Sequence, residues 1–208
     1  MILIMGPSGS GKTTVSKELE KLNCYIVPTY TTRLPRPSDD FTICLNRDDF
    51  YKLLMKNAFI AYHSFDSKMG RVSYGIPTME YENSRRPLSN FPPVMIATYE
   101  YMNDIMKYAK NHGDEPIFKV YLDVDKRTII RKSTSDKSRG DSNIDLLNRL
   151  ERDKDKNNEL RKMADLIITN YKMEITPQKI ADTILTKYRE YLNDLIKGGR
   201  TIWKKCLE

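Results

Sequence analysis

The chain is poor in cysteine, histidine and tryptophan. Its 208 residues include three cysteines, two histidines and one tryptophan. The cysteines Cys24, Cys44 and Cys206 are odd in number and far apart, which argues against a disulfide framework and against a structural zinc site. This cysteine usage fits a reducing compartment, so we expect a cytoplasmic protein.

Long apolar runs and repeats are also missing. No apolar run approaches the roughly 18 residues of a membrane span, and the N-terminal apolar stretch is too short for a signal peptide. We therefore expect no membrane partner. The sequence has no internal repeat and no low-complexity segment. Its length suits one α/β domain over residues 1–208, with a real apolar core.

The charge is basic but not decisive. Thirty-five Lys and Arg against 28 Asp and Glu give a net charge of +7. Such an excess is typical of nucleic-acid-binding proteins, but a protein that handles nucleotides needs a basic cleft in any case. We expect no stable nucleic-acid binding.

What the sequence does contain is a glycine-rich loop near its start. Residues 1–5 (MILIM) are an apolar run long enough for one buried strand. Residues 6–13 (GPSGSGKT) then match the pattern G-x-x-x-x-G-K-[ST] without a mismatch, and residues 14–22 have apolar side chains at helical spacing. Strand, loop and helix in this order predict a phosphate-binding loop for ATP.

The residue types of this loop suit a polyphosphate. Glycines allow backbone conformations in which successive N–H groups converge on phosphate oxygens. Lys12 would place its charge at the β and γ oxygens, and the hydroxyl of Thr13 would bind the Mg²⁺ that bridges them. The expected ATP-binding residues are Gly6, Ser8, Gly9, Ser10, Gly11, Lys12, Thr13 and Thr14.

A pair of arginines follows a short predicted strand at residues 24–28. Residues 31–36 read TTRLPR, so that Arg33 and Arg36 lie three apart with Pro35 between them. Proline stiffens the backbone, and two guanidinium groups on a stiff segment suit a phosphate. The alternative is an ordinary solvated loop. The preceding phosphate loop favours the first interpretation.

Together these motifs resemble a known family. GPSGSGKTT, TTRLPR at this distance and YGIP at residues 74–77 are similar to the guanylate kinase family of nucleoside monophosphate kinases. SRG at 138–140 followed by NRL at 148–150 resembles the lid arginines of that family, and ADLIITN at 164–170 its last core strand. The resemblance spans about residues 1–185. It implies Mg²⁺- and ATP-dependent phosphoryl transfer to a nucleoside monophosphate.

The implied fold is α/β, a P-loop NTPase-type parallel sheet flanked by helices, with a small mixed α/β monophosphate-binding insert and a helical lid. The core would cover about 1–32, 80–125 and 160–196, the insert 33–79, the lid 126–156 and a C-terminal tail 197–208. The apolar patterns agree with this division. They predict an antiparallel insert with strands at 41–45, 59–64 and 71–74 and a helix at 48–57, core strands at 94–98, 117–124 and 165–169, and helices at 101–111 and from 176 onward.

The resemblance also assigns roles to single residues. Thr29, Arg33, Arg36 and Tyr74 would hold the acceptor phosphate. In the charged segment 126–156, Arg139 and Arg149 would be lid arginines that neutralise charge during transfer, so the expected catalytic residues are Lys12, Arg33, Arg139 and Arg149. Lys154 and Lys156 are expected on a solvated face.

The positions that read the base depart from the family. Thr42 lies where the family has a tyrosine, and Ala61 replaces the glutamate that binds guanine. Ala97 and Tyr99 lie where two aspartates would be, and only Glu100 could stand in for them. A site that loses a buried acceptor leaves donors on guanine unpaired, so GMP specificity is doubtful. Thr42, Ala61 and Tyr99 are retained as expected acceptor-site residues.

Several alternatives remain open. A less acidic pocket lined also by His63 could accept a pyrimidine, or no base at all. AYHS at 61–64 resembles a string in ribose 1,5-bisphosphate phosphokinases, although Arg36 is retained here. A non-catalytic interaction module and a hydrolytic P-loop NTPase are further options. The oligomeric state is expected to be monomer or homodimer.

Overall fold

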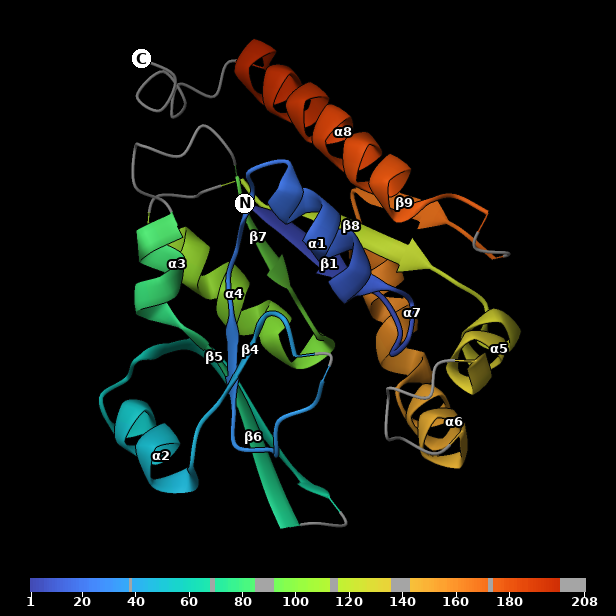
Figure 1. Cartoon of the computed structure of the whole chain (residues 1–208). Coiled ribbons are helices and arrows are strands. Elements are labelled where there is room, and N and C mark those ends of the chain that lie inside the picture. Colours follow the sequence, from blue (N-terminus) through green and yellow to red (C-terminus); the bar gives the residue numbers. More distant parts are fainter. Residues whose placement is uncertain are drawn as a thin grey trace.

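The computed structural model describes residues 1–37, 39–67, 70–84, 92–112, 116–135, 143–171 and 174–198. Its centre is a five-stranded sheet whose paired strands are all parallel (Figure 1). In sheet order the strands are β2 (Tyr25–Ile26), β7 (Pro93–Ile96), β1 (Ile2–Met5), β8 (Phe118–Asp123) and β9 (Leu166–Thr169). The parallel sheet predicted from the sequence is confirmed.

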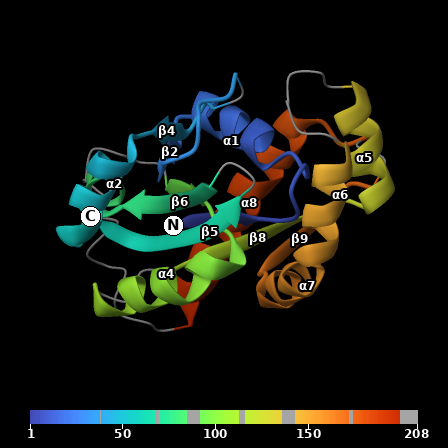
Figure 2. The same ribbon diagram turned by 90° about the horizontal axis from the view of Figure 1, so that it is seen from below.

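Both faces of this sheet are buried. On β1, Ile2 and Ile4 pack on one face while Leu3 and Met5 pack on the other, as the two-residue period of a strand requires. The first face is covered by α1 (Lys12–Lys21) and α8 (Pro177–Lys197), and the second by α4 (Tyr99–Asn111) and α7 (Lys154–Met163) (Figure 2). Burial on both sides explains why residues 1–5 are a continuous apolar run.

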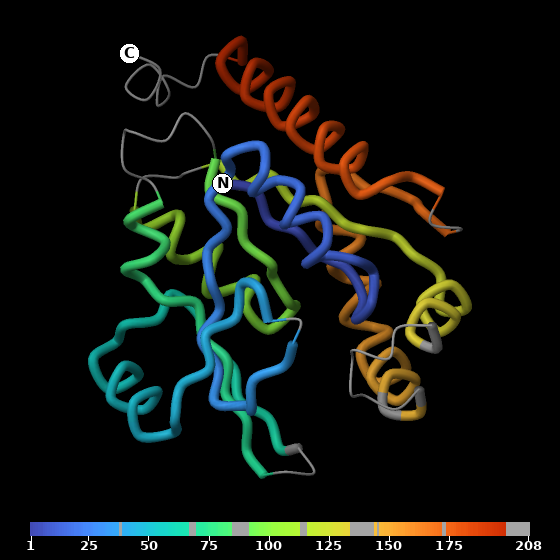
Figure 3. Tube along the Cα trace, viewed as in Figure 1, coloured from blue at the N-terminus to red at the C-terminus, as the bar shows by residue number. Residues whose placement is uncertain are grey.

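A second sheet forms the insert. Its order is β4 (Thr42–Cys44), β3 (Thr29–Thr31), β6 (Gly70–Pro77) and β5 (Phe59–Ser67). The chain leaves the central sheet after β2 and returns to it at β7 (Figure 3). β3 lies in this second sheet, although the boundary expected from the sequence placed it in the core.

The sequence predicted an antiparallel insert, but one pair of strands in the insert sheet is parallel. β5–β6 and β3–β6 pair antiparallel, but β3 and β4 pair parallel. The parallel pairing arises from the connection of residues 32–41, which carries the two arginines. This connection crosses over, so that β4 runs beside β3 in the same direction. A hairpin turn would have reversed the chain.

The helix α2 (Arg47–Met55) covers one face of the insert sheet. Its N-cap is Asn46, whose side chain accepts a hydrogen bond from the N–H of Asp49 at 2.8 Å. Phe50 is fully buried and stacks on Phe59, with ring centroids 4.7 Å apart. The opposite face of the sheet packs toward α4, where Ala61 and Ile76 join the central core. The insert is thereby fixed between α2 and α4.

Three helices follow β8. They are α5 (Lys126–Ser135), α6 (Asn143–Arg152) and α7, and the first two share a small apolar cluster of Val124, Ile129 and Leu146. Asp125 caps α5 by accepting a hydrogen bond from the N–H of Thr128 at 3.0 Å.

The sequence did not predict α3 (Thr78–Ser84). No helix in the described ranges is long and apolar enough to cross a membrane.

Replacement of Gly75 tests the packing of the insert. A Cβ at this position would lie 2.6 Å from Cδ1 of Phe59, so Gly75→Ala must displace a ring that is stacked on Phe50. We expect the free energy of unfolding in urea to fall by roughly 1–3 kcal/mol. Gly198→Ala, at the exposed C-cap of α8, is the matched control and should change it by less than about 0.5 kcal/mol. Equal values for the two variants would contradict this packing.

Candidate active site

The loop from Gly6 to Thr13 joins β1 to α1 and lies on the side of the molecule where α6 is found (Figures 1 and 2). Gly6, Gly9 and Gly11 have φ angles of 146°, 85° and 93°, a region that side chains with a Cβ rarely adopt. At Gly6 the constraint is also steric, because a Cβ there would lie 2.7 Å from the carbonyl oxygen of Leu122 on β8. The glycine pattern in the sequence thus corresponds to a left-handed backbone packed against the sheet.

Lys12 is the first residue of α1. Its ammonium group donates hydrogen bonds to the carbonyl oxygens of Gly6 and Pro7, both at 2.8 Å, so its charge lies over the loop. Thr13 and Ser8 are half-buried, and Thr14 is exposed in the first turn of α1. Ser10 is buried, and its hydroxyl has no hydrogen-bond partner among the described residues. The amide groups at the start of a helix, with a lysine beside them, are suited to an anion.

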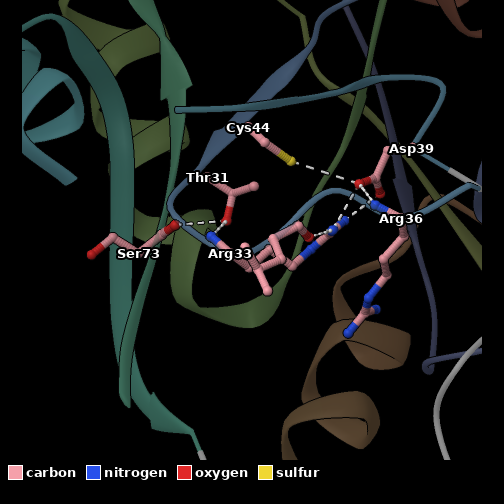
Figure 4. A network of polar contacts seen from close by, with 7 residues as sticks. Thr31, Arg33, Arg36, Asp39, Cys44 and Ser73 are labelled. Atoms are coloured by element: carbon pink, nitrogen blue, oxygen red, sulfur yellow. Dashed lines mark hydrogen bonds and ion pairs between the residues drawn. The ribbon is translucent and has the colours of Figure 1, made fainter. Parts of the chain in front are cut away.

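Arg33 lies in a network of polar contacts at the end of β3 (Figure 4). Its Nη1 donates to the carbonyl oxygen of Leu34 at 2.8 Å and to Oδ2 of Asp39 at 2.7 Å, while its Nη2 pairs with Oδ1 of Asp39. Burial alone would lower the pKa of the guanidinium, but the bonds to Asp39 and the nearby Tyr74 raise it overall. Arg33 is therefore a permanent cation whose side chain is mostly buried.

Asp39 is a site residue that the sequence analysis did not single out. Besides Arg33, its carboxylate accepts hydrogen bonds from the backbone N–H of Arg36 at 2.7 Å and from Sγ of Cys44 at 3.7 Å. Burial alone would raise the pKa of Asp39, but these donors lower it, so the group is an anion. The signal that could have found it is an acidic residue three positions after Arg36 on a proline-stiffened loop.

The next residue, Asp40, connects this loop to the glycine-rich loop's helix. Its Oδ1 forms an ion pair with Nζ of Lys17 on α1 at 2.8 Å. Asp39 and Asp40 therefore face in two directions, one toward Arg33 and the other toward α1. This places the arginine-bearing loop 32–41 beside the helix that begins at Lys12.

The insert sheet aligns several of the expected acceptor-site residues. Thr29 pairs with Thr42, and Tyr74 pairs with Thr31 on one side and with His63 on the other. Because paired residues and residues two apart share a face of a sheet, Thr29, Thr42, Tyr74 and His63 lie on the face opposite α2. The sheet thus brings together residues that are up to 45 positions apart in the sequence.

Two other expected residues are placed differently. Ala61 lies on the same face but is only 2% exposed and belongs to the apolar core, so it offers almost no surface to a ligand. Tyr99 is the first residue of α4 and is 42% exposed. Ala97, where the family has an aspartate, is also buried in the core. Two positions where the family has carboxylates are therefore filled by core methyl groups here.

Glu100 and Lys156 form an ion pair between α4 and α7, with Oε1 and Nζ 2.5 Å apart. Lys156, expected on a solvated face, keeps 43% of its side chain exposed, but it also binds a carboxylate 56 positions away that the sequence did not indicate. Burial alone would raise the pKa of Glu100, but the hydrogen bond from Lys156 lowers it overall. The carboxylate that could replace the missing aspartates is thus already paired.

Only one of the two expected lid arginines lies among the described residues. Arg149 is half-buried on α6, whereas Arg139 lies outside the described residues. Nearby, Arg152 pairs with Asp153 at 2.8 Å. In the described ranges no group of three or more His, Cys, Asp or Glu side chains could hold a metal ion.

Substitution of Lys156 tests the pair with Glu100. Lys156→Met removes the largest of the interactions that oppose burial, so we expect the pKa of Glu100 to rise, as measured by NMR titration of its carboxyl carbon. Lys154→Met, on the same helix, removes the same charge and should leave this pKa unchanged.

The pH dependence of stability has a defined sign. The pKa of Glu100 is lower in the folded chain, so its stabilisation is complete above the unfolded value of about 4.3 and is lost as pH falls through the folded value. Lys156→Met should lose this contribution, measured as a smaller drop in the free energy of unfolding between neutral and acid pH. An unchanged Glu100 pKa would show that the pair does not persist in solution.

Comparisons with known proteins give structural matches only. No family model and no curated protein sequence matches the chain. A guanylate kinase from Anaplasma phagocytophilum superposes with a TM-score of 0.61 at 14% identity, covering 100% of this chain and 93% of that one. A sugar kinase from Janibacter sp. HTCC2649 has a TM-score of 0.47 at 14% identity, covering 89% and 91%. The chain thus shares its fold, a five-stranded parallel sheet flanked by helices, with this guanylate kinase structure.

Proposed function

We propose that the protein transfers the γ-phosphoryl group of ATP to a phosphate oxygen of a nucleoside monophosphate or a similar phosphomonoester. The observation that carries this proposal is the ion pair between Asp40 and Lys17 at 2.8 Å. It ties the arginine-bearing loop to the helix of the glycine-rich loop, so that the proposed sites for a donor polyphosphate and an acceptor phosphate would lie next to each other.

The donor side consists of the glycine-rich loop. Its backbone amides and Lys12 would hold the β- and γ-phosphates, with Gly6, Ser8, Gly9, Ser10, Gly11, Thr13 and Thr14 completing the ATP site. The donor set fits Mg²⁺, which keeps most of its ligands as water and phosphate oxygens and needs only the Thr13 hydroxyl from the chain. When bound, the ion would neutralise charge on the nucleotide.

The acceptor side is the face of the insert sheet opposite α2. Arg33, Arg36 and Tyr74 would bind the acceptor phosphate, with Thr29 and Thr42 on the same face. A phosphate oxygen is already anionic at neutral pH, so the attack needs no general base. Arg149 on α6, together with Arg139, would neutralise the transferred group when the helices α5 and α6 approach the site.

The acceptor is not expected to be GMP. Ala61 and Ala97 replace carboxylates and are buried in the core, and Glu100 is paired with Lys156. Guanine would have to break this pair or leave its own donors unsatisfied, either of which costs binding energy. The same site could bind another nucleoside monophosphate or a sugar phosphate, since both carry the phosphomonoester that Arg33 recognises.

A panel of acceptors tests the proposal. Purified protein would be given Mg²⁺-ATP with GMP, dGMP, AMP, CMP, UMP, dTMP or ribose 1,5-bisphosphate, and product formation measured. We expect turnover of at least one acceptor, with GMP not the best. Lys12→Ala should lower kcat by roughly a hundredfold or more. Lys21→Ala, on the exposed side of the same helix, is the matched control and should leave kcat within about twofold.

The outcomes separate the alternatives. GMP as the best acceptor by about tenfold or more would contradict the proposed specificity. ATP binding with no turnover of any acceptor would favour an interaction module, and ATP hydrolysis without an acceptor would favour a hydrolytic NTPase.

A further inference from the structure

The guanidinium of Arg33 has two edges on which an anion can bind with two parallel hydrogen bonds. One edge consists of Nη1 and Nη2, the other of Nε and Nη2. Asp39 occupies the first edge, with Nη1 at 2.7 Å from Oδ2 and Nη2 paired with Oδ1. On the second edge, Nε is buried and has no hydrogen-bond partner in the described part of the chain. The unsatisfied donor therefore lies on the edge that Asp39 does not occupy, and Tyr74 also interacts with this guanidinium.

An unsatisfied buried N–H is costly, so one in an otherwise complete network points to a missing acceptor. The surroundings of Arg33 are held firmly. Asp39 is bound by the N–H of Arg36 at 2.7 Å and by Sγ of Cys44 at 3.7 Å, and the N–H of Arg33 donates to Oγ1 of Thr31 at 3.3 Å (Figure 4). The side chains of Arg33 and Asp39 are only 13% and 11% exposed. The position of the open edge is thus fixed by the chain itself.

We propose that Asp39 is a positioning residue for the acceptor: by holding the Nη1–Nη2 edge of Arg33, it presents the Nε–Nη2 edge to a phosphomonoester. This inference rests on the proposed function. Tyr74 lies close to the same guanidinium and on the sheet face of the acceptor site, so its hydroxyl can reach the same anion. Asp39 itself touches Arg33 and not the acceptor.

The opposite role for Asp39 would be that of an internal anion that competes with the acceptor phosphate for Arg33. The two roles predict opposite changes in phosphate affinity when the carboxylate is removed. Removal of the carboxylate raises the positive potential around Arg33, which by Coulomb attraction alone would strengthen phosphate binding. A weaker phosphate affinity after this removal must therefore come from the loss of positioning, provided that the fold is intact.

The test uses ribose 5-phosphate, which carries the phosphomonoester without a base. The donor site is first saturated with Mg²⁺ and a non-hydrolysable ATP analogue, so that the probe cannot occupy the glycine-rich loop, and binding is measured by calorimetry. We expect Asp39→Asn to weaken binding roughly tenfold, and Asp39→Glu, which keeps the charge, to restore most of the affinity. Asp48→Asn is the matched control: it removes an exposed carboxylate on α2, on the opposite face of the insert sheet from the acceptor site, and should change the affinity less than about twofold.

Two further measurements keep the test sharp. Asp39→Asn loses a mostly buried ion pair and should have a lower Tm than Asp48→Asn, but both variants should unfold cooperatively well above the assay temperature. Equal affinities of the two variants for the ATP analogue would then exclude general unfolding as the cause. In an Arg33→Ala background, Asp39→Asn should have no further effect on the probe, because its role acts through Arg33.

The proposal is overturned if Asp39→Asn binds the probe equally well or more tightly, if its effect persists without Arg33, or if the unmodified protein does not bind the probe. These outcomes are distinct from failure of the proposed function. Turnover of an acceptor with an unaffected Asp39→Asn variant would retain the kinase and reject the positioning role. Weakened probe binding without turnover of any acceptor would retain the positioning role and reject the transfer reaction.

Discussion

The rest of the structure depends on the burial of β1 at the centre of the parallel sheet. Ile2 and Ile4 pack toward α1 and α8 while Leu3 and Met5 pack toward α4 and α7, so the strand cannot shift by one residue without exchanging its two faces. This register fixes where the glycine-rich loop begins. Gly6 then passes so close to the carbonyl oxygen of Leu122 that only glycine fits, and α1 starts at Lys12 with its amides toward the loop. A buried strand thus determines the position of the candidate donor site.

Most of the central sheet could be predicted because its signals are local. Apolar runs mark β1, β7, β8 and β9, and Thr176 with Pro177 marks the start of α8, where the Thr176 side chain accepts a hydrogen bond from Lys179. The insert could be predicted only in part. Whether β4 runs parallel or antiparallel to β3 depends on the path of residues 32–41, and no periodicity in the sequence encodes that path. The helix α3 was missed because its seven residues carry too few apolar positions to show a helical period.

The candidate site, too, could be predicted only where its signals are local in the sequence. Glycine spacing and the Arg33–Arg36 pair are visible in the sequence because each motif lies within a few residues. Their partners are not. Asp40 meets Lys17, and Glu100 meets Lys156 across 56 positions, so these ion pairs follow from tertiary packing alone. At Ala61 the sequence instead indicated a role that the fold does not favour. The resemblance marks this position for ligand binding, but its methyl group packs in the core beside Ile76. A motif predicts which chemistry is present, whereas the fold decides which side chains are free to perform it.

A site that binds a polyphosphate beside a phosphomonoester must gather cations that repel each other when no substrate is bound. Here Lys12 donates to loop carbonyls, Arg33 is paired with Asp39, and Lys156 with Glu100. These internal partners offset the repulsion and hold the side chains in place. Less side-chain conformational entropy is then lost when a substrate binds. The partners differ in what they leave available. Carbonyl oxygens carry no net charge, so an incoming phosphate can displace them from Lys12, whereas the Arg33–Asp39 pair is buried and doubly bonded and would be costly to break. In the proposed site, an acceptor phosphate would therefore gain more by satisfying the unpaired Nε of Arg33 than by replacing Asp39, and a positive site would be kept ordered without blocking its ligand.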